Sequence, residues 1–208
     1  MQDFKMSNTS LFMNAPSNQD ILNALNDMVP KNESYQRVRL LIDTSSHITV
    51  EHTPIPTPDS SFGMLDEAAL SDPCFNVTLD ILPIQDPHQD PFIMHKTTFR
   101  DVYNTARERT ACEWHPAQYQ PFDVILYNNK QQVTETSIAN IAIGFPENGK
   151  RVWKTPQVEC GLLPGVFRSY LISTKQVQQD IITLDELKLA QQNGYPIICF
   201  NSVRKAYR

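Results

Sequence analysis

The stretch TETSIANIAI, residues 134–143, decides the fold that we predict for this chain, because it places one carboxylate between two strand-like segments. The residues before it, FDVILYNNKQQV at 122–133, read as an apolar strand, a turn at Asn128-Asn129 and a returning strand. The second strand of this predicted hairpin delivers Glu135. Ser137 and Asn140 follow it in the segment that continues into the apolar run of residues 141–143.

Two further segments carry groups suited to an anion. In TPQVECGLLPGVFRS, residues 155–169, Pro164 and Gly165 open a predicted helix with Val166 and Phe167 in its first turn. Free N–H groups and the positive end of the helix dipole make such a start an anion site. In the last segment, ICFNSVRKAYR, an apolar strand is followed by the hydroxyl of Ser202.

A lysine precedes all three segments, in HKTTFRDVYNTAR at residues 95–107. Lys96 follows the apolar run Pro91–Met94, which we expect to bring it out of a buried segment into a site. Desolvation there would favour a neutral, nucleophilic amine. Taken alone, each of these residues has an ordinary reading as a surface lysine, a strand-end carboxylate, a turn or an exposed serine.

The four segments together resemble the aminodeoxychorismate lyase-like branch of the class IV aminotransferase family. Glu135 lies 39 residues after Lys96, the Pro-Gly helix start 30 residues further, and the strand-end Asn-Ser pair 36 beyond that. The resemblance covers roughly residues 35–208. It implies an α+β, fold-type IV pyridoxal-phosphate enzyme of the D-amino acid aminotransferase-like kind.

The resemblance also implies a role for each candidate residue. Lys96 would link covalently to the aldehyde of pyridoxal 5'-phosphate and later act as the catalytic base. Glu135 would keep the pyridine nitrogen of the cofactor protonated, with Ser137 and Asn140 beside the ring. The phosphate would be bound by the backbone amides of Val166 and Phe167 and by the hydroxyl of Ser202.

The reaction that this branch implies is conversion of 4-amino-4-deoxychorismate to 4-aminobenzoate and pyruvate, a step toward folate. Two alternatives stay open at this point. One is a transaminase acting on D- or branched-chain amino acids through the same Lys96 and Glu135. The other is a non-catalytic remnant of the fold that partners another chain. The resemblance further implies a homodimer.

The chain organisation suggests two unequal parts after a polar start. We expect residues 1–16 to be poorly ordered, residues 17–90 to form a small, incomplete N-terminal domain, and residues 91–208 to form the larger cofactor-binding domain. The expected elements are helices at 17–28, 97–110 and 183–192, two strands within 37–55, and another strand in FNVTLDILPI at 75–84.

Composition excludes several classes of function. The formal net charge of −5 offers no basic footprint for nucleic acid, and no apolar run approaches a membrane span. Four scattered cysteines favour reduced thiols, and we expect a cytoplasmic protein. Cys112 and His115 could begin a zinc site, but no second close pair completes it, so we predict no metal.

Two departures from the family pattern bear on activity. Members usually carry several dozen more N-terminal residues, with an arginine that binds the cofactor phosphate. We expect this chain to begin after that segment, and therefore to show weak cofactor binding and impaired lyase activity. Arg37 and Arg39 match nothing known to bind phosphate. At Lys205 the lyase-like branch often has glycine.

Overall fold

The computed structural model describes residues 15–31, 35–56, 65 and 75–207. The chain forms two compact units, residues 1–62 and 63–208, and each is described by itself. The predicted disorder of residues 1–16 falls almost entirely on residues that lie outside the described ones.

Within its described residues, 15–31 and 35–56, the small unit has a helix and a β-hairpin where the sequence predicts them. These are α2 (Asn18–Met28), β1 (Gln36–Ile42) and β2 (Ile48–Pro54). The Ser17 side chain accepts a hydrogen bond from the Asp20 amide at 3.2 Å, and the Asp20 carboxylate accepts one from the Ser17 amide at 2.8 Å. This reciprocal cap is what fixes the helix start at the predicted residue.

The hairpin turns where the sequence predicts it. The Asp43 carboxylate accepts hydrogen bonds from the Ser45 and His47 amides, both at 2.9 Å, and so fixes the turn. Arg39 forms an exposed ion pair with Glu51 across the two strands. Val50 is the single described side chain of this unit that is buried, so the unit has a thin core.

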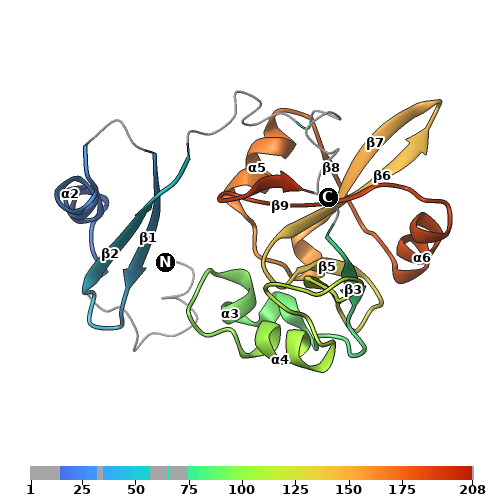
Figure 1. Cartoon of the computed structure of the whole chain (residues 1–208), viewed down its shortest axis with the longest axis horizontal. Helices are drawn as coiled ribbons and strands as arrows, with labels where there is room; N and C mark the ends of the chain where they lie inside the picture. The colour runs from blue at the N-terminus through green and yellow to red at the C-terminus, as the bar shows by residue number, and fades with distance from the viewer. Residues whose placement is uncertain (1–14, 32–34, 57–64, 66–74, 208) are drawn as a thin grey trace. The chain divides into compact units, whose positions relative to one another are not determined.

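The larger unit is built on two sheets (Figure 1). The three-stranded sheet, in the order β3-β4-β5, contains β3 (Val77–Leu79), β4 (Asp123–Tyr127) and β5 (Val133–Thr136). The five-stranded sheet has the order β10-β9-β6-β7-β8, and its strands are β6 (Asn140–Glu147), β7 (Lys150–Pro156), β8 (Gln178–Asp180), β9 (Ile197–Asn201) and β10 (Lys205–Tyr207).

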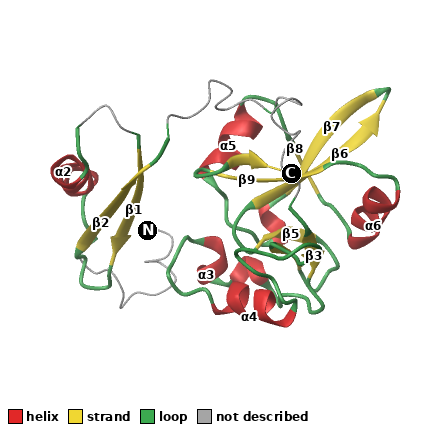
Figure 2. Ribbon diagram, viewed as in Figure 1, coloured by secondary structure: helices red, strands yellow, loops and turns green. Residues whose placement is uncertain are grey.

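Helices cover both sheets of this unit (Figure 2). They are α3 (Pro91–Met94), α4 (Asp101–Arg109), α5 (Val166–Ser173) and α6 (Leu184–Gln192), with short 3-10 turns η2 (Pro87–Gln89) and η3 (Val158–Cys160). The mixture of helices with separate, largely antiparallel sheets is the α+β class that the sequence predicts.

Strand β6 shows how the layers are ordered. Ile141 and Ile143 pack in a core with α6 and the three-stranded sheet, whereas Ala142 between them packs in a core with α5. Side chains alternate between the two faces of a strand, so α5 and α6 cover opposite faces of the five-stranded sheet. The segment 141–143 is apolar throughout because both faces of β6 are buried.

The boundary between the units differs from the predicted one at residue 90. Strand β3 pairs in parallel with β4, with Val77 opposite Asp123, so residues 77–79 belong to the sheet of the larger unit. The sequence places this strand in the small domain because the proline-rich stretch after it, at residues 83–91, indicates the connection into the larger domain. Its parallel partner is 46 residues away in sequence, and only tertiary pairing reveals it.

The predicted helix at 97–110 is shorter in the structure, because α4 begins at Asp101. The Thr97 hydroxyl donates a hydrogen bond to the Phe99 carbonyl at 3.0 Å, a local contact that competes with helical hydrogen bonding. Lys96 therefore lies in an extended loop between α3 and α4. The helix at 183–192 is confirmed, with the Thr183 and Glu186 capping box that the sequence predicts.

None of the helices in the described part of the chain is both long and apolar enough to cross a bilayer.

Candidate active site

Glu135 is a fully enclosed carboxylate near the end of β5. The residue is 4% exposed, and its Oε1 accepts hydrogen bonds from the Tyr103 hydroxyl at 2.8 Å and the Leu163 amide at 3.2 Å. Burial raises the pKa of Glu135 to about 7, and the Tyr103 and Leu163 hydrogen bonds oppose that rise. Near neutral pH this group can therefore either hold a proton or accept a cation.

Asn140 joins Glu135 to the loop before α5. Its Nδ2 donates to Glu135 Oε2 at 3.3 Å and to the Leu163 carbonyl at 2.9 Å. A Cβ atom on Gly165 would lie only 2.4 Å from Asn140 Oδ1. Glycine at 165 thus lets the start of α5 approach Asn140 closely, and one amide side chain sets the spacing between the carboxylate and the helix start.

The first turn of α5 presents backbone donors, as the sequence predicts. Gly165 is the N-cap residue, and it has no side chain that could cap the helix. Phe167 is buried, whereas Val166 is 80% exposed. Because no capping side chain competes for them, the backbone amides of Val166 and Phe167 can donate to an anion at the positive end of the helix dipole.

Lys96 shares its electrostatic surroundings with Glu135 and Arg100. The residue is exposed in the loop before α4, yet burial of part of its side chain is the main cause that lowers the pKa of its ammonium. The neighbouring Arg100 charge lowers that pKa further, and the Glu135 carboxylate raises it. A lowered pKa increases the fraction of neutral, nucleophilic amine, as expected for a lysine that attacks a carbonyl.

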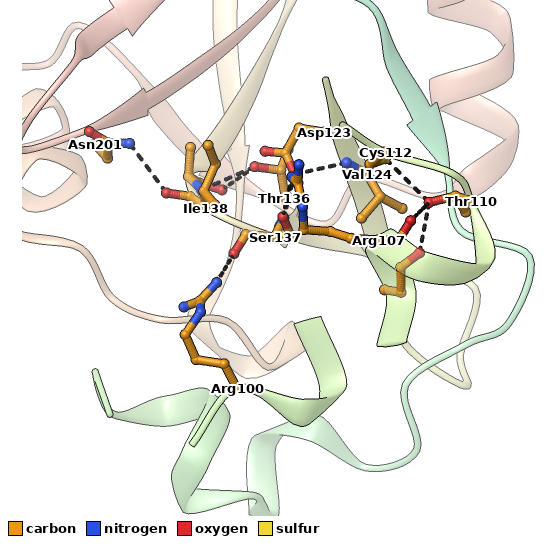
Figure 3. Close-up of polar contacts among 12 residues, drawn as sticks. Arg100, Arg107, Thr110, Cys112, Asp123, Val124, Thr136, Ser137, Ile138 and Asn201 are labelled. Atoms are coloured by element: carbon orange, nitrogen blue, oxygen red, sulfur yellow. Dashed lines mark hydrogen bonds and ion pairs between the residues drawn. The ribbon is translucent and has the colours of Figure 1, made fainter. Parts of the chain in front are cut away.

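The structure gives the Ser137 side chain a different environment from the predicted one beside a cofactor ring. Figure 3 shows its hydroxyl in a buried network, where it donates to Asp123 Oδ1 and accepts from Arg107 Nη1 at 3.1 Å. Arg107 and Asp123 also form an ion pair at 3.2 Å. The single hydroxyl proton of Ser137 is donated to Asp123, so in this structure the Ser137 side chain anchors the turn after β5. A contact between Ser137 and the cofactor stays a prediction.

Ser202 lies in the exposed turn between β9 and β10. Strand β9 pairs with β6 so that Phe200 lies opposite Asn140, which places the turn beyond the same strand end as Asn140. The Asn201 side chain donates to the Ile138 carbonyl at 3.2 Å and fastens this turn to the segment after β5 (Figure 3). The tertiary structure thus brings Ser202 to the same end of the sheet as Asn140, the first residue of β6.

Three groups that sequence reasoning did not identify complete the site. They are the Tyr103 hydroxyl and the Leu163 amide, which both bind Glu135, and Arg100, which donates from Nη2 to the Ser137 carbonyl at 2.5 Å. Tyr103 is 32 residues from its partner in sequence, and a tyrosine on a helix face is ordinarily read as a core residue. Arg100 stands four residues after Lys96, and that spacing was the one signal available in the sequence.

This set of donors fits pyridoxal 5'-phosphate. From the described residues, Glu135 Oε2 accepts one long hydrogen bond, at 3.3 Å from Asn140, and so retains capacity for a protonated ring nitrogen. The amides of Val166 and Phe167 would hold the phosphate, and Lys96 would hold the aldehyde carbon. Among the described residues, no three His, Cys, Asp or Glu side chains are placed to bind a metal ion.

Known proteins support this fit. The family model described as amino-transferase class IV matches residues 4–206. A protein from Schizosaccharomyces pombe named "Putative aminodeoxychorismate lyase" is 33% identical over 99% of this chain and 79% of its own length. The aminodeoxychorismate lyase of Saccharomyces cerevisiae is 26% identical over 85% of this chain, which spans about half, 51%, of that protein.

The fold is also that of a solved structure, which is titled as an amino-acid aminotransferase from Mesorhizobium loti. It superposes with a TM-score of 0.70 at 24% identity, over 93% of this chain and 82% of its own. At that identity the likeness supports the fold, and the family follows from the model that matches nearly the whole chain. This chain belongs to the class IV aminotransferase family, the fold-type IV enzymes that depend on pyridoxal 5'-phosphate.

Proposed function

We propose that this chain is a lyase that converts 4-amino-4-deoxychorismate to 4-aminobenzoate and pyruvate. The observation that carries the proposal is the buried Glu135 carboxylate, connected through Asn140 to the start of α5 and electrostatically coupled to Lys96. The names of the two curated relatives favour the lyase over other reactions of the family.

Each residue has a defined task in this proposal. When bound, pyridoxal phosphate supplies an electron sink at the carbon that carries the substrate amine. Lys96 Nζ would hold the cofactor, release it to the substrate amine, and then accept the proton from that carbon. Glu135 Oε2 would keep the ring nitrogen protonated, and the Tyr103 hydroxyl and the Leu163 amide donate to Oε1 and so hold the carboxylate in place.

The proposed reaction needs no second substrate, because 4-aminobenzoate and pyruvate together contain every atom of 4-amino-4-deoxychorismate. A transaminase, in contrast, requires a 2-oxo acid to take up the amino group. The alternative of a transaminase acting on D- or branched-chain amino acids would use the same Lys96 and Glu135, and nothing in the described site favours it.

A direct assay separates the two reactions. The protein, supplied with pyridoxal phosphate and 4-amino-4-deoxychorismate but no 2-oxo acid, should release 4-aminobenzoate and pyruvate in equal amounts. Turnover only with added 2-oxo acid and an amino acid would replace the lyase with the transaminase. Absence of both activities, with cofactor bound, would favour the non-catalytic form of the fold.

The attachment site is tested independently of turnover. Borohydride reduction of the protein with bound cofactor, followed by peptide mass analysis, should find the phosphopyridoxyl group on Lys96. Lys154 is a suitable internal comparison, because its ammonium is paired with Glu147 at 2.7 Å and Asp180 at 3.0 Å and its pKa is raised. Modification of Lys154, Lys130 or Lys150 in place of Lys96 would overturn the assignment.

The proposal includes a homodimer, as the family resemblance implies, and a cytoplasmic location, which the scattered cysteines favour. Neighbouring large apolar side chains of the larger unit support association, because Ile81 is 66% and Leu82 55% exposed. Sedimentation of the protein with cofactor should give twice the chain mass, and a monomer at assay concentration would contradict this part.

A further inference from the structure

Lys205 is held at a defined place by the turn that precedes it. The Asn201 Oδ1 atom accepts hydrogen bonds from the Val203 amide at 3.0 Å and the Arg204 amide at 2.8 Å. This arrangement closes the turn and returns the chain, so that Lys205 pairs with Asn201 across β9 and β10. The lysine therefore lies three residues after Ser202, at the edge of the five-stranded sheet.

The Lys205 side chain reaches the start of α5. Its Nζ atom lies 4.9 Å from the centroid of the Phe167 ring, and Phe167 is the second residue of that helix. The Phe167 ring in turn packs edge-on against Phe200 of β9, with centroids 6.4 Å apart. Figure 1 shows α5 beside β9. Packing between the helix and this strand thus brings the Lys205 ammonium against a side chain of the first turn of α5, the turn whose amides are proposed for the phosphate.

The backbone at Lys205 is unfavourable for a lysine. Its φ is 59°, in the left-handed region that glycine adopts without strain and that costs other residues roughly 1–2 kcal/mol. Partial burial also lowers the pKa of the Lys205 ammonium.

We propose that the Lys205 ammonium is a ligand of the cofactor phosphate, acting with the amides of Val166 and Phe167 and the hydroxyl of Ser202. This inference rests on the proposed cofactor site and goes beyond it, because it assigns the phosphate a cation from the C-terminal turn. The relevant ligand chemistry is a phosphate dianion, whose charge-assisted hydrogen bond to an ammonium adds affinity.

The test compares pyridoxal phosphate with pyridoxal, which lacks the phosphate, in spectroscopic binding titrations of the full chain. Lys205→Met keeps an unbranched apolar side chain, one atom shorter than lysine, that can still pack against Phe167, but it removes the charge. It should weaken pyridoxal phosphate binding by about tenfold and leave pyridoxal binding unchanged. Lys205→Arg keeps the charge and should stay within about threefold of the parent.

A second variant separates this role from a structural one. Lys205→Gly relieves the positive φ, so it should raise the melting temperature of the cofactor-free protein while weakening pyridoxal phosphate binding as Lys205→Met does. Weakened binding of both ligands would show that Lys205 only supports the fold, and unchanged phosphate binding in Lys205→Met would equally overturn the inference.

The outcome for Lys205 is distinct from the outcome for the cofactor site. A parent protein that fails to bind pyridoxal phosphate at Lys96 refutes both the proposed function and this inference. A parent that binds it there, with Lys205 variants that bind equally well, refutes the inference alone.

Discussion

Glu135 sets the pH behaviour of the site at the scale of a single residue. Its carboxylate is 4% exposed and receives hydrogen bonds from Tyr103, Leu163 and Asn140. Burial outweighs these donors and raises the pKa of Glu135 to about 7. In the cofactor-free protein burial makes the ionised form costly even beside the Lys96 and Arg100 charges, and a protonated ring nitrogen would add a cation in direct contact with the carboxylate.

The Glu135 carboxylate should be essential for turnover and dispensable for attachment of the cofactor. We expect Glu135→Gln and Glu135→Ala to abolish 4-aminobenzoate formation, because the ring nitrogen loses its proton and the electron sink weakens. Borohydride reduction should still label Lys96 in both variants. Turnover of either variant at the parent rate would show that the carboxylate has no electronic role.

The raised pKa of Glu135 also predicts how stability depends on pH. Between the unperturbed pKa of 4.5 and the folded value of about 7, the folded protein binds more protons at Glu135 than the unfolded chain does. The contribution of this residue to the free energy of unfolding is therefore largest below pH 4.5 and falls as the pH rises to 7, by roughly 3 kcal/mol.

Urea unfolding of the cofactor-free protein at several pH values measures the slope of the free energy of unfolding against pH. The slope between pH 4.5 and 7 should be less negative in Glu135→Gln than in the parent, whatever the absolute stability of the variant. Glu113→Gln, at an exposed position, is the matched control and should keep the parent slope. Parallel curves for Glu135→Gln and the parent would contradict the raised pKa.

At the scale of elements, the site depends on how closely α5 approaches β6. Asn140 begins β6 and binds both Glu135 and the Leu163 carbonyl, so it fixes the α5 start relative to the carboxylate. Gly165 permits this approach, because any Cβ there would meet Asn140 Oδ1 at 2.4 Å. The position of the N-terminal end of α5 thus depends on the Asn140 side-chain amide and on the absence of a Cβ atom at Gly165.

Gly165→Ala should weaken pyridoxal phosphate binding by about tenfold, because Asn140 must move and the helix start shifts from the carboxylate. The backbone at Gly165, with φ −62°, suits alanine, so the effect would come from the contact alone. Gly149→Ala is the control. Its Cβ would have nothing within 4 Å, but its φ of +76° strains alanine.

Spectroscopic titration and thermal melting distinguish the two glycine variants. Gly149→Ala should lower the melting temperature with unchanged cofactor affinity, whereas Gly165→Ala should lose affinity. Equal affinities of Gly165→Ala and the parent would mean that the Asn140 side chain can shift without moving α5. The position of α5 would then not depend on glycine at 165.

At the scale of the whole molecule, the two units differ in how much they bury. The larger unit has continuous apolar cores on both faces of β6, including Ile141, Ala142 and Ile143 at 0% exposure. In the described part of the small unit, Val50 is the sole buried side chain, and Leu22 and Met28 of α2 are 52% and 55% exposed. Less apolar burial gives a lower free energy of local opening.

Amide hydrogen exchange should therefore be faster in the small unit than in the larger unit. We expect amides of β1 and β2, such as Leu40 and Val50, to exchange at least tenfold faster than amides of β6 and β9, such as Ala142 and Ile198. Mass spectrometry of peptides after timed labelling measures both sets in one sample. Equal protection would show that the small unit is stabilised by contacts beyond those in its own described core.

The sequence by itself determined the local elements and the identity of the candidate residues. The Ser17 and Thr183 capping boxes and the Asn128 turn were predictable because their partners lie within a few residues. The order and spacing of the segments around Lys96, Glu135, Gly165 and Ser202 were enough to suggest the family, which the matching family model confirmed.

Only the tertiary structure decided which of those residues meet and what each side chain does. The contact of Tyr103 with Glu135, the parallel pairing of β3 with β4, and the use of the Ser137 hydroxyl by Asp123 all join residues 14 to 46 positions apart. Local periodicity has no information about such pairs, because they arise from how strands and helices pack. The contact between the Lys205 ammonium and the Phe167 ring is another such pair, because the closed turn before β10 positions Lys205 beside α5.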